Sequence, residues 1–355
     1  MSKVYTAAAF AAAAVVLRLL CGVSGFAERF TQIMNPIAVN TLGRLSGFLP
    51  FSLAEMLIYL LILLLVVWIV RSIVKGVRRT GAGKYMLNRG AVLLLIAAVL
   101  FFLYEANQDV PFSQPSFSER YGLSSGSYST ENLAATGRML IQNINARAGS
   151  VSRDENEIMT VSGNLKERIR TAMENEAKIY PILSGYYPET KDVFNSWALS
   201  YLGITGVFSA ATMEANVNVD MTAYNIPFTM CHELSHLHGS MPEDECNFIA
   251  YLACRDSSDA DISYSGYLTG WVYVGNELYA RDKSLWESAA GQLDQRANLD
   301  LEANSKYWDA RKGKARETAD SLNDSYLKSQ GESEGILSYD KAVDLIVTEY
   351  LKNGS

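Results

Sequence analysis

Histidine is the scarcest side chain in this sequence: three occur among 355 residues, and all three fall within seven consecutive positions, 232–238. Cysteine is also scarce, with four residues. Cys246 and Cys254 lie eight positions apart, which is about 12 Å along one helix and too far for a disulfide between them. We therefore expect buried free thiols rather than a disulfide framework, although a bond between Cys231 and Cys246 stays geometrically possible.

Several signatures of other protein classes are missing. The chain contains no phosphate-binding loop, no dinucleotide fingerprint and no internal repeat. Its three N-terminal apolar runs, at 4–23, 53–70 and 91–104, contain only Arg18 and Glu55 as charged residues, which argues against a transporter or channel. The rest of the chain is polar and acidic, and the total of 38 acidic against 31 basic residues argues against a nucleic-acid partner.

Hydrophobic residues divide the chain into two unlike parts. Residues 1–105 are strongly apolar and predict a membrane domain with three transmembrane helices, at about 4–23, 51–71 and 87–105. The first span has a cleaved signal peptide as its alternative, and the third has a re-entrant segment. Residues 106–355 have the size of one folded domain with a sizeable core.

Basic residues predict how the spans are oriented. The loop between spans two and three carries six of them: Arg71, Lys75, Arg78, Arg79, Lys84 and Arg89. The loop between spans one and two carries only Arg29 and Arg44 against Glu28. Because basic loops stay on the cytoplasmic side, three crossings would place residues 106–355 outside the cytoplasmic membrane.

The histidine cluster contains the motif HExxH, formed by His232, Glu233 and His236. On an α-helix the two histidines lie one turn apart on the same face, so both imidazoles can bind one zinc ion. Neutral imidazoles leave the ion a strong Lewis acid, and Glu233 can serve as the general base that takes a proton from water. The alternative is a histidine-rich helix without a metal, because the motif also arises by chance.

Proline and glycine mark the ends of the helix that carries this motif. Pro227 suits a first helical turn and Gly239 suits the left-handed position after the last, which predicts a helix over 227–238. A metzincin would place its third histidine at position 242, where this chain has Pro242, so that interpretation fails. Pro242 and the acids after it instead predict a second helix, whose first turn supplies a carboxylate as third ligand.

The sequence after Pro242 resembles a known class of peptidases. Glu245, followed by Cys246 and Asn247, is similar to the Glu-Ala-Asn-type helix of gluzincin metallopeptidases, and this resemblance implies that Glu245 is the third zinc ligand. Glu243 and Asp244 are the alternatives. The chain also resembles an uncharacterised bacterial membrane family with three N-terminal spans and an HELSH motif. The matching segments are PFSLAE at 50–55, MEANVN at 213–218, IPFTMCHELSHLHG at 226–239, EDECNFIAYLAC at 243–254 and NDSYLK at 323–328.

Other residues are candidates for contacts with a substrate. Residues 212–220 alternate polar and apolar side chains, which predicts a half-buried strand and makes Glu214 and Asn216 candidates on its polar face. In zincins the strand before the HExxH helix is an edge strand along which a peptide lies; an ordinary wet edge strand is the alternative. Since no histidine is left to stabilise an oxyanion, the remaining candidates for that role come from the following helices. They are Tyr251, Tyr264, Tyr267 and Arg255.

We therefore expect a mostly α, α+β protein: three transmembrane helices, then a zincin-like, predominantly helical extracytoplasmic domain with a small β-sheet. Helical periodicity places further helices at 131–146, 162–179 and 338–351. The expected function is a membrane-anchored metallopeptidase that uses Zn²⁺ held by His232, His236 and Glu245 to hydrolyse a polypeptide substrate. The alternative is an inactive zincin-derived binding or sensing module at the cell surface.

Overall fold

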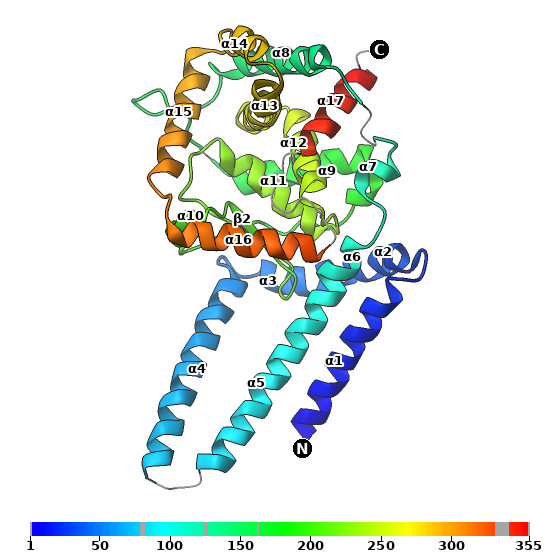
Figure 1. Ribbon diagram of the computed structural model, residues 1–355, viewed down its shortest axis with the longest axis vertical. Coiled ribbons are helices and arrows are strands. Elements are labelled where there is room, and N and C mark those ends of the chain that lie inside the picture. The colour runs from blue at the N-terminus through cyan, green and yellow to red at the C-terminus, as the bar shows by residue number, and fades with distance from the viewer. Residues whose placement is uncertain (1, 79–81, 124–126, 162, 331–340, 354–355) are drawn as a thin grey trace. The chain divides into compact units, whose positions relative to one another are not determined.

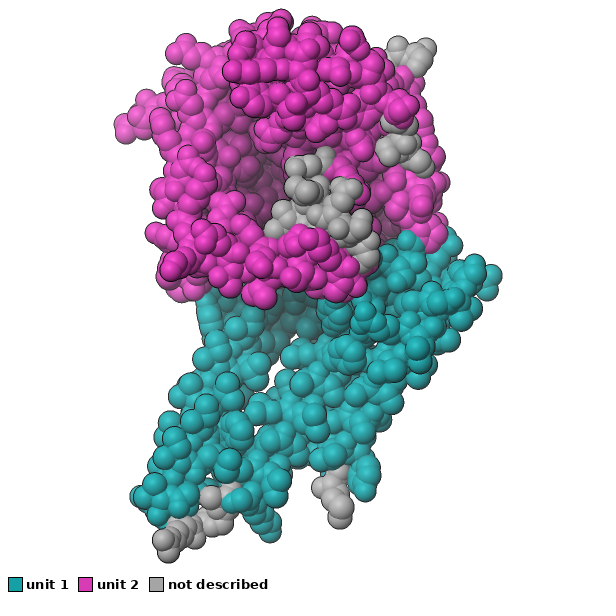
Figure 2. Space-filling model, viewed as in Figure 1, with its two compact units in different colours: residues 1–114, 209–214 teal, residues 115–208, 215–355 magenta. Residues whose placement is uncertain are grey.

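Helices dominate the structure, and they form two compact units. The structure is a computed structural model and describes residues 2–78, 82–123, 127–161, 163–330 and 341–353. Residues 1–114 together with 209–214 form unit 1, and residues 115–208 together with 215–355 form unit 2 (Figure 2). Arg79 of the basic loop and positions 162 and 338–340 of two expected helices lie outside the described residues.

Unit 1 is built from three long helices and the short helices that join them (Figure 1). Its elements are α1 (Ser2–Leu20), α2 (Phe26–Ala38), the π-helix η1 (Val39–Gly43), α3 (Arg44–Gly47), α4 (Leu53–Val77), α5 (Ala82–Tyr104), the π-helix η2 (Glu105–Asp109) and α6 (Val110–Phe112). Helix α5 packs against both α1 and α4.

Three stretches of unit 1 are long and apolar enough to cross a membrane, which confirms that part of the sequence analysis. They are Ser2–Leu20, Leu53–Val77 and Gly83–Phe112. The third is 30 residues long, because the helix begins in the polar loop and continues through η2 and α6. Helix α4 buries only Glu55, while its leucine, isoleucine and valine side chains face outward, as expected of a helix that meets lipid.

Unit 2 contains the remaining elements, with strands that reach the boundary residues Ser209 and Glu214. These are α7 (Phe117–Arg120), α8 (Thr130–Arg147), α9 (Leu165–Ile179), the 3-10 helix η3 (Pro181–Leu183), β1 (Lys191–Asp192), α10 (Ser196–Leu202), β2 (Gly206–Ser209), β3 (Glu214–Val217), α11 (Asn225–Leu237), α12 (Glu243–Arg255), α13 (Ala260–Arg281), α14 (Lys283–Ala290), α15 (Gln295–Asp309), α16 (Lys314–Ser329) and α17 (Ala342–Asn353).

The core of unit 2 surrounds three consecutive helices, α11, α12 and α13, each of which packs against the other two. All residues from Pro227 to Leu237 on α11 and from Glu245 to Cys254 on α12 are buried. Helix α13 adds Ile262, Leu268 and Trp271 to the same core, and α8, α14 and α17 pack on it. Side chains on α11 and α12 are therefore held by packing on rigid elements.

The sheet differs from the expected single strand over 212–220. Two strands, β2 and β3, flank a turn that contains Met213 at a positive φ of 51°. The strand order is β1-β3-β2, and β1 pairs with β3 in parallel through Lys191 opposite Asn216. All four residues of β3 are buried. The prediction of a half-buried edge strand is wrong, because β3 has a neighbour on each side and both of its faces are covered.

Candidate metal centre

Helix α11 carries the HExxH motif in the way its flanking residues predict. Pro227 is the third helical residue, within the first turn, where a missing N–H costs no hydrogen bond. Gly239 follows the helix at a φ of 91°, a left-handed conformation that glycine adopts without strain, and its N–H donates to the carbonyl of His236. The expected helix over 227–238 is confirmed, with two more residues at its start and one fewer at its end, where His238 is the C-cap.

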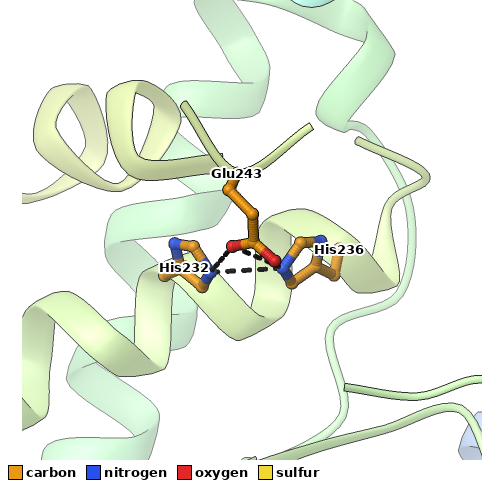
Figure 3. Close-up of side chains that lie close together, drawn as sticks. All are labelled: His232, His236 and Glu243. Atoms are coloured by element: carbon orange, nitrogen blue, oxygen red, sulfur yellow. Dashed lines mark hydrogen bonds and ion pairs between the residues drawn. The ribbon is translucent and has the colours of Figure 1, made fainter. Parts of the chain in front are cut away.

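The two motif histidines and one glutamate converge on one point (Figure 3). His232 Nε2 and His236 Nε2 lie 3.2 Å apart, one helical turn from each other. Glu243, the first residue of α12, places its Oε2 3.1 Å from His232 Nε2 and 3.7 Å from His236 Nε2. Three potential ligand atoms from two adjoining helices therefore surround a space between them.

These separations fit a zinc ion. Ligand atoms about 2.0–2.1 Å from a tetrahedral ion lie about 3.3–3.4 Å from one another. The observed separations of 3.2, 3.1 and 3.7 Å scatter around that value. Two imidazoles and one carboxylate are also the ligand set of many catalytic zinc sites, which keep the fourth position open. The three side chains are 11%, 10% and 16% exposed, so the cluster is mostly buried and a small part of each side chain meets solvent.

Electrostatics favour a positive charge at the centre of this cluster. Burial alone would raise the pKa of Glu243, but the two imidazoles hold that pKa well below its usual value. Burial opposes a charged His236, yet the neighbouring Cys246 and Glu243 raise the pKa of its imidazole. Without a metal, a proton on an imidazole supplies one positive charge to the cluster, and a bound divalent cation would supply two.

The ring of His236 is oriented by groups behind it. Its Nδ1 lies 3.0 Å from the backbone carbonyl of Ser240, so a proton on Nδ1 donates there and leaves Nε2 free to bind a cation. Cys246 Sγ lies 3.3 Å from the same Nδ1 and donates to the same carbonyl. The thiol therefore supports the ring from the side opposite Nε2. Phe208 of β2 stacks on the imidazole at a centroid distance of 6.1 Å.

Glu233 is buried beside the cluster with an unused oxygen. Its side chain is 3% exposed, and its Oε2 has no hydrogen-bond partner among the described residues. Burial raises the pKa of Glu233 to about 7, although His232 and His236 pull it down. A buried carboxylate with an unpaired oxygen next to imidazoles is suited to exchange protons with a bound water.

Gly206 of β2 is a residue that the sequence analysis missed. A Cβ at this position would lie 2.3 Å from Glu233 Oε1 and 2.8 Å from its Cδ. Since real Cβ atoms do not approach that closely, only glycine leaves room for the Glu233 carboxylate in its observed place. A glycine within a strand often marks the close approach of another group, so Gly206 in the sequence could have indicated this contact.

Glu245, the ligand implied by the gluzincin resemblance, lies elsewhere. Its Oε1 accepts a hydrogen bond from Ser118 Oγ at 2.5 Å, and its Oε2 accepts one from Ser118 N–H at 3.0 Å. Positions two apart on a helix point about 200° away from each other, so Glu243 and Glu245 cannot both face α11. The structure brings Glu243 to the histidines, while Asp244 Oδ1 accepts from the backbone N–H of Glu245.

The two strand candidates have structural contacts. Glu214 belongs to unit 1, where its Oε1 and Oε2 accept the backbone N–H groups of Leu53 and Ala54 at 2.9 and 2.8 Å. It thereby caps the start of α4. Asn216 donates from Nδ2 to the carbonyl of Val207, which ties β3 to β2. Neither side chain reaches the surface, since 2% and 4% of their areas are exposed.

The aromatic candidates lie in the helical core. Tyr264 donates to Asp300 Oδ2 at 2.5 Å and belongs to a network of buried polar groups. Tyr251 is fully buried, and its hydroxyl has no partner among the described residues. Tyr267 lies under the guanidinium of Arg147, and Arg255 pairs with Glu349 on α17. These contacts describe packing, and none of them assigns an oxyanion role.

The cysteines are free thiols, as expected; Cys231, Cys246 and Cys254 are buried, whereas Cys21 is partly exposed. Cys231 Sγ lies 3.6 Å from Cys254 Sγ, and Cys246 faces His236, so the pairing of Cys231 with Cys246 does not form.

Comparison with known proteins gives a family without an activity. Neither a curated protein nor a solved structure matches the chain. A family model described as "Protein of unknown function (DUF3810)" matches residues 30–347, a range that begins in α2, ends in α17 and contains His232, His236 and Glu243. Because this match covers most of its length, the chain belongs to the DUF3810 family.

Proposed function

We propose that this protein is a membrane-anchored zinc metallopeptidase. The observation that carries the proposal is the convergence of His232 Nε2, His236 Nε2 and Glu243 Oε2 at separations of 3.1–3.7 Å. The buried and partly unpaired carboxylate of Glu233 supports the same conclusion, because a purely structural metal site has no use for a free acid beside it.

The roles of the residues follow from their positions. His232, His236 and Glu243 would hold the ion, which supplies Lewis acidity and brings the pKa of water near 7 when bound. Glu233 accepts a proton from the attacking water as the water oxygen bonds to the substrate's carbonyl carbon. As the C–N bond breaks, Glu233 delivers that proton to the departing amine. Ser240 and Cys246 keep the His236 ring oriented throughout.

We further propose that unit 2 faces the extracytoplasmic side. The end of α4, the start of α5 and the link between them are rich in basic residues, and such regions stay in the cytoplasm. The residues concerned are Arg71, Lys75, Arg78, Arg79, Lys84 and Arg89. A reporter that is active only outside the cytoplasm, fused after Asn353, should be active, and the same reporter inserted at position 80 should be silent. The reverse pattern would place the site inside the cell.

The deciding experiment compares wild type with Glu233→Gln in the full-length protein purified in detergent. Zinc content is measured by mass spectrometry, and cleavage is followed on a library of peptides. We expect wild type and variant to bind one zinc per chain, and the variant to lose at least about 100-fold in rate, because general-base catalysis contributes about 10²–10⁴-fold.

Glu174→Gln provides the matched control, because this glutamate lies exposed on α9 and should change neither zinc content nor rate. Equal rates for Glu233→Gln and wild type would refute the mechanism. Zinc in both proteins without cleavage of any peptide would favour a binding or sensing module.

A further inference from the structure

The segment between the first and second membrane spans is helical over nearly its whole length. Residues 26–47, which comprise α2, η1 and α3, are called the connecting segment here. Helix α1 ends six residues before it at Leu20, and α4 begins six residues after it at Leu53. Because both spans are joined by this one segment, its ends lie at the same surface of the bilayer. Figure 1 shows α2 and α3 running across the direction of α1, α4 and α5 within unit 1.

One stripe of α2 is buried against unit 1. Ala27, Thr31, Asn35 and Ala38 recur at helical spacing, and all four are buried. Helix α2 contacts α6 and η2. Small side chains on this stripe allow close packing, so the protein itself occupies this side of the helix.

A second stripe is apolar, with two half-buried phenylalanines and two exposed isoleucines. Phe26, Phe30, Ile33 and Ile37 follow the spacing i, i+4, i+7, i+11 and therefore share one face. Ile33 is 62% exposed and Ile37 51%, while the two phenylalanine rings pack on each other at 5.6 Å between centroids. The exposure continues beyond the segment at Phe48, which is 83% exposed.

A third stripe is polar. Gln32 donates to Glu28, and Arg44 donates to Asn40, each over one helical turn. Arg29 is exposed next to Glu28. Acidic and basic side chains are mixed on this stripe, so its charge gives no strong preference for an anionic surface.

We propose that the connecting segment lies in the surface of the same bilayer that the three spans cross, with its apolar stripe among the lipid chains. The continuity with α1 and α4 identifies the occupant, because the short links to these two spans hold both ends of the segment close to the membrane surface. An amphipathic helix parallel to the membrane places its apolar face at the boundary of headgroups and acyl chains. With a mixed polar stripe, burial of apolar area drives insertion, and a zwitterionic bilayer is sufficient.

The test uses the full-length protein in phosphatidylcholine vesicles, in a Cys21→Ala background. Cys21 is the one native cysteine that is not fully buried. Three variants, Ile33→Cys, Phe48→Cys and Gln32→Cys, each carry one environment-sensitive fluorophore. Quenching by lipids with a nitroxide near the headgroup is compared with quenching by iodide, which is present on both sides of the membrane.

We expect labels at positions 33 and 48 to be quenched several-fold more by the lipid nitroxide than the label at position 32, and several-fold less by iodide. Gln32 is the matched control, because it adjoins Ile33 in sequence but lies on the polar stripe. Gln32, Ile33 and Phe48 are all exposed, so these substitutions leave the packing of unit 1 intact.

Three outcomes would overturn the proposal. Equal iodide quenching at positions 32 and 33 would mean that the stripe faces water. Protection of position 33 from both quenchers would mean that a protein surface covers it, such as a second copy of the chain. Lipid quenching that appears only after addition of phosphatidylglycerol would make headgroup charge the cause of binding. The experiment does not depend on zinc or hydrolysis, so its result is independent of the proposed function.

Discussion

Helix α4 of unit 1 and helix α13 of unit 2 place their apolar side chains in opposite ways. On α4 of unit 1, Leu57, Ile58 and Leu63 face outward and only Glu55 is buried. On α13 of unit 2, Ile262 and Leu268 are fully buried instead. The same residue types are placed oppositely because a lipid surface replaces water as the surroundings of unit 1, and apolar side chains facing lipid cost nothing.

Glu214 of unit 1 and the two acids of the candidate metal centre in unit 2 differ in what surrounds their carboxylates. In unit 1 both oxygens of Glu214 accept backbone N–H groups. In unit 2 Glu243 faces two imidazoles, and Glu233 keeps an oxygen without a partner in the described part of the chain. A buried acid saturated by the backbone holds structure, whereas one with open oxygens beside imidazoles can bind a cation or move a proton. Three substitutions test this distinction.

Replacement of Glu243 should have the largest effect. Glu243→Ala removes a direct ligand, and we expect zinc affinity to fall by well over 100-fold, more than the roughly 10- to 100-fold that outer-shell partners contribute. Competition with a fluorescent chelator measures it. Glu245→Ala is the control: it loses two hydrogen bonds to Ser118 and some thermal stability but should keep its zinc. If Glu245→Ala lost its zinc and Glu243→Ala kept it, Glu245 would be the third ligand, as the gluzincin resemblance implies.

Replacement of Glu214 should affect stability without affecting metal. Glu214→Ala leaves the N–H groups of Leu53 and Ala54 without their charged acceptor, and we expect a loss of about 3 kcal/mol, since hydrogen bonds to charged groups contribute about 1.5–3 kcal/mol each. Thermal unfolding in nanodiscs measures the loss, and faster amide exchange at residues 53–54 locates it. Glu28→Ala, which removes a surface hydrogen bond with Gln32, should change little. Unchanged exchange at residues 53–54 would show that Glu214 is not the cap.

Replacement of Glu176 should give the smallest and only pH-dependent effect. Burial raises the pKa of Glu176 from 4.5 to about 7, with Asp256 adding to the rise and Arg255 opposing it. Because the folded pKa lies above the unfolded one, the folded state holds the proton more tightly. The contribution of Glu176 to stability is therefore most favourable below pH 4.5 and falls as the pH rises toward 7.

Glu176→Gln stays neutral, so we expect it to lack this decline and to be more stable than wild type by about 2 kcal/mol at pH 8. Melting temperatures at pH 5 and pH 8 measure the difference, with the exposed Glu174→Gln as control. A parallel decline in wild type and Glu176→Gln would exclude Glu176 as its source.

Local signals explain what could be predicted from the sequence. Pro227, Gly239 and the histidine spacing act within one helix, so they predict α11 and the convergence of His232 and His236. Length and apolar composition likewise predict the three spans, because the hydrocarbon core sets the length of a crossing helix.

Long-range pairing explains what could not be predicted. The choice between Glu243 and Glu245 depends on which side of α12 meets α11, and Ser118, far away in sequence, holds Glu245 on the other side. The role of Glu214 depends on α4, whose residue Ala54 lies 160 positions away. An alternating pattern gave no sign that β3 would have neighbours on both sides.

The turn between β2 and β3 ties the two halves of the chain together covalently. Residues 209–214 belong to unit 1, where Asn107 donates to the carbonyl of Ala210 and Gly43 lies against Met213. A fragment that starts at Pro115 would contain this turn but none of those partners, so Met213 would lose its contact with Gly43 and Glu214 its contact with α4. We therefore expect β2 and β3 to be poorly ordered in a fragment that lacks residues 1–114, and biochemical work should use the intact polypeptide.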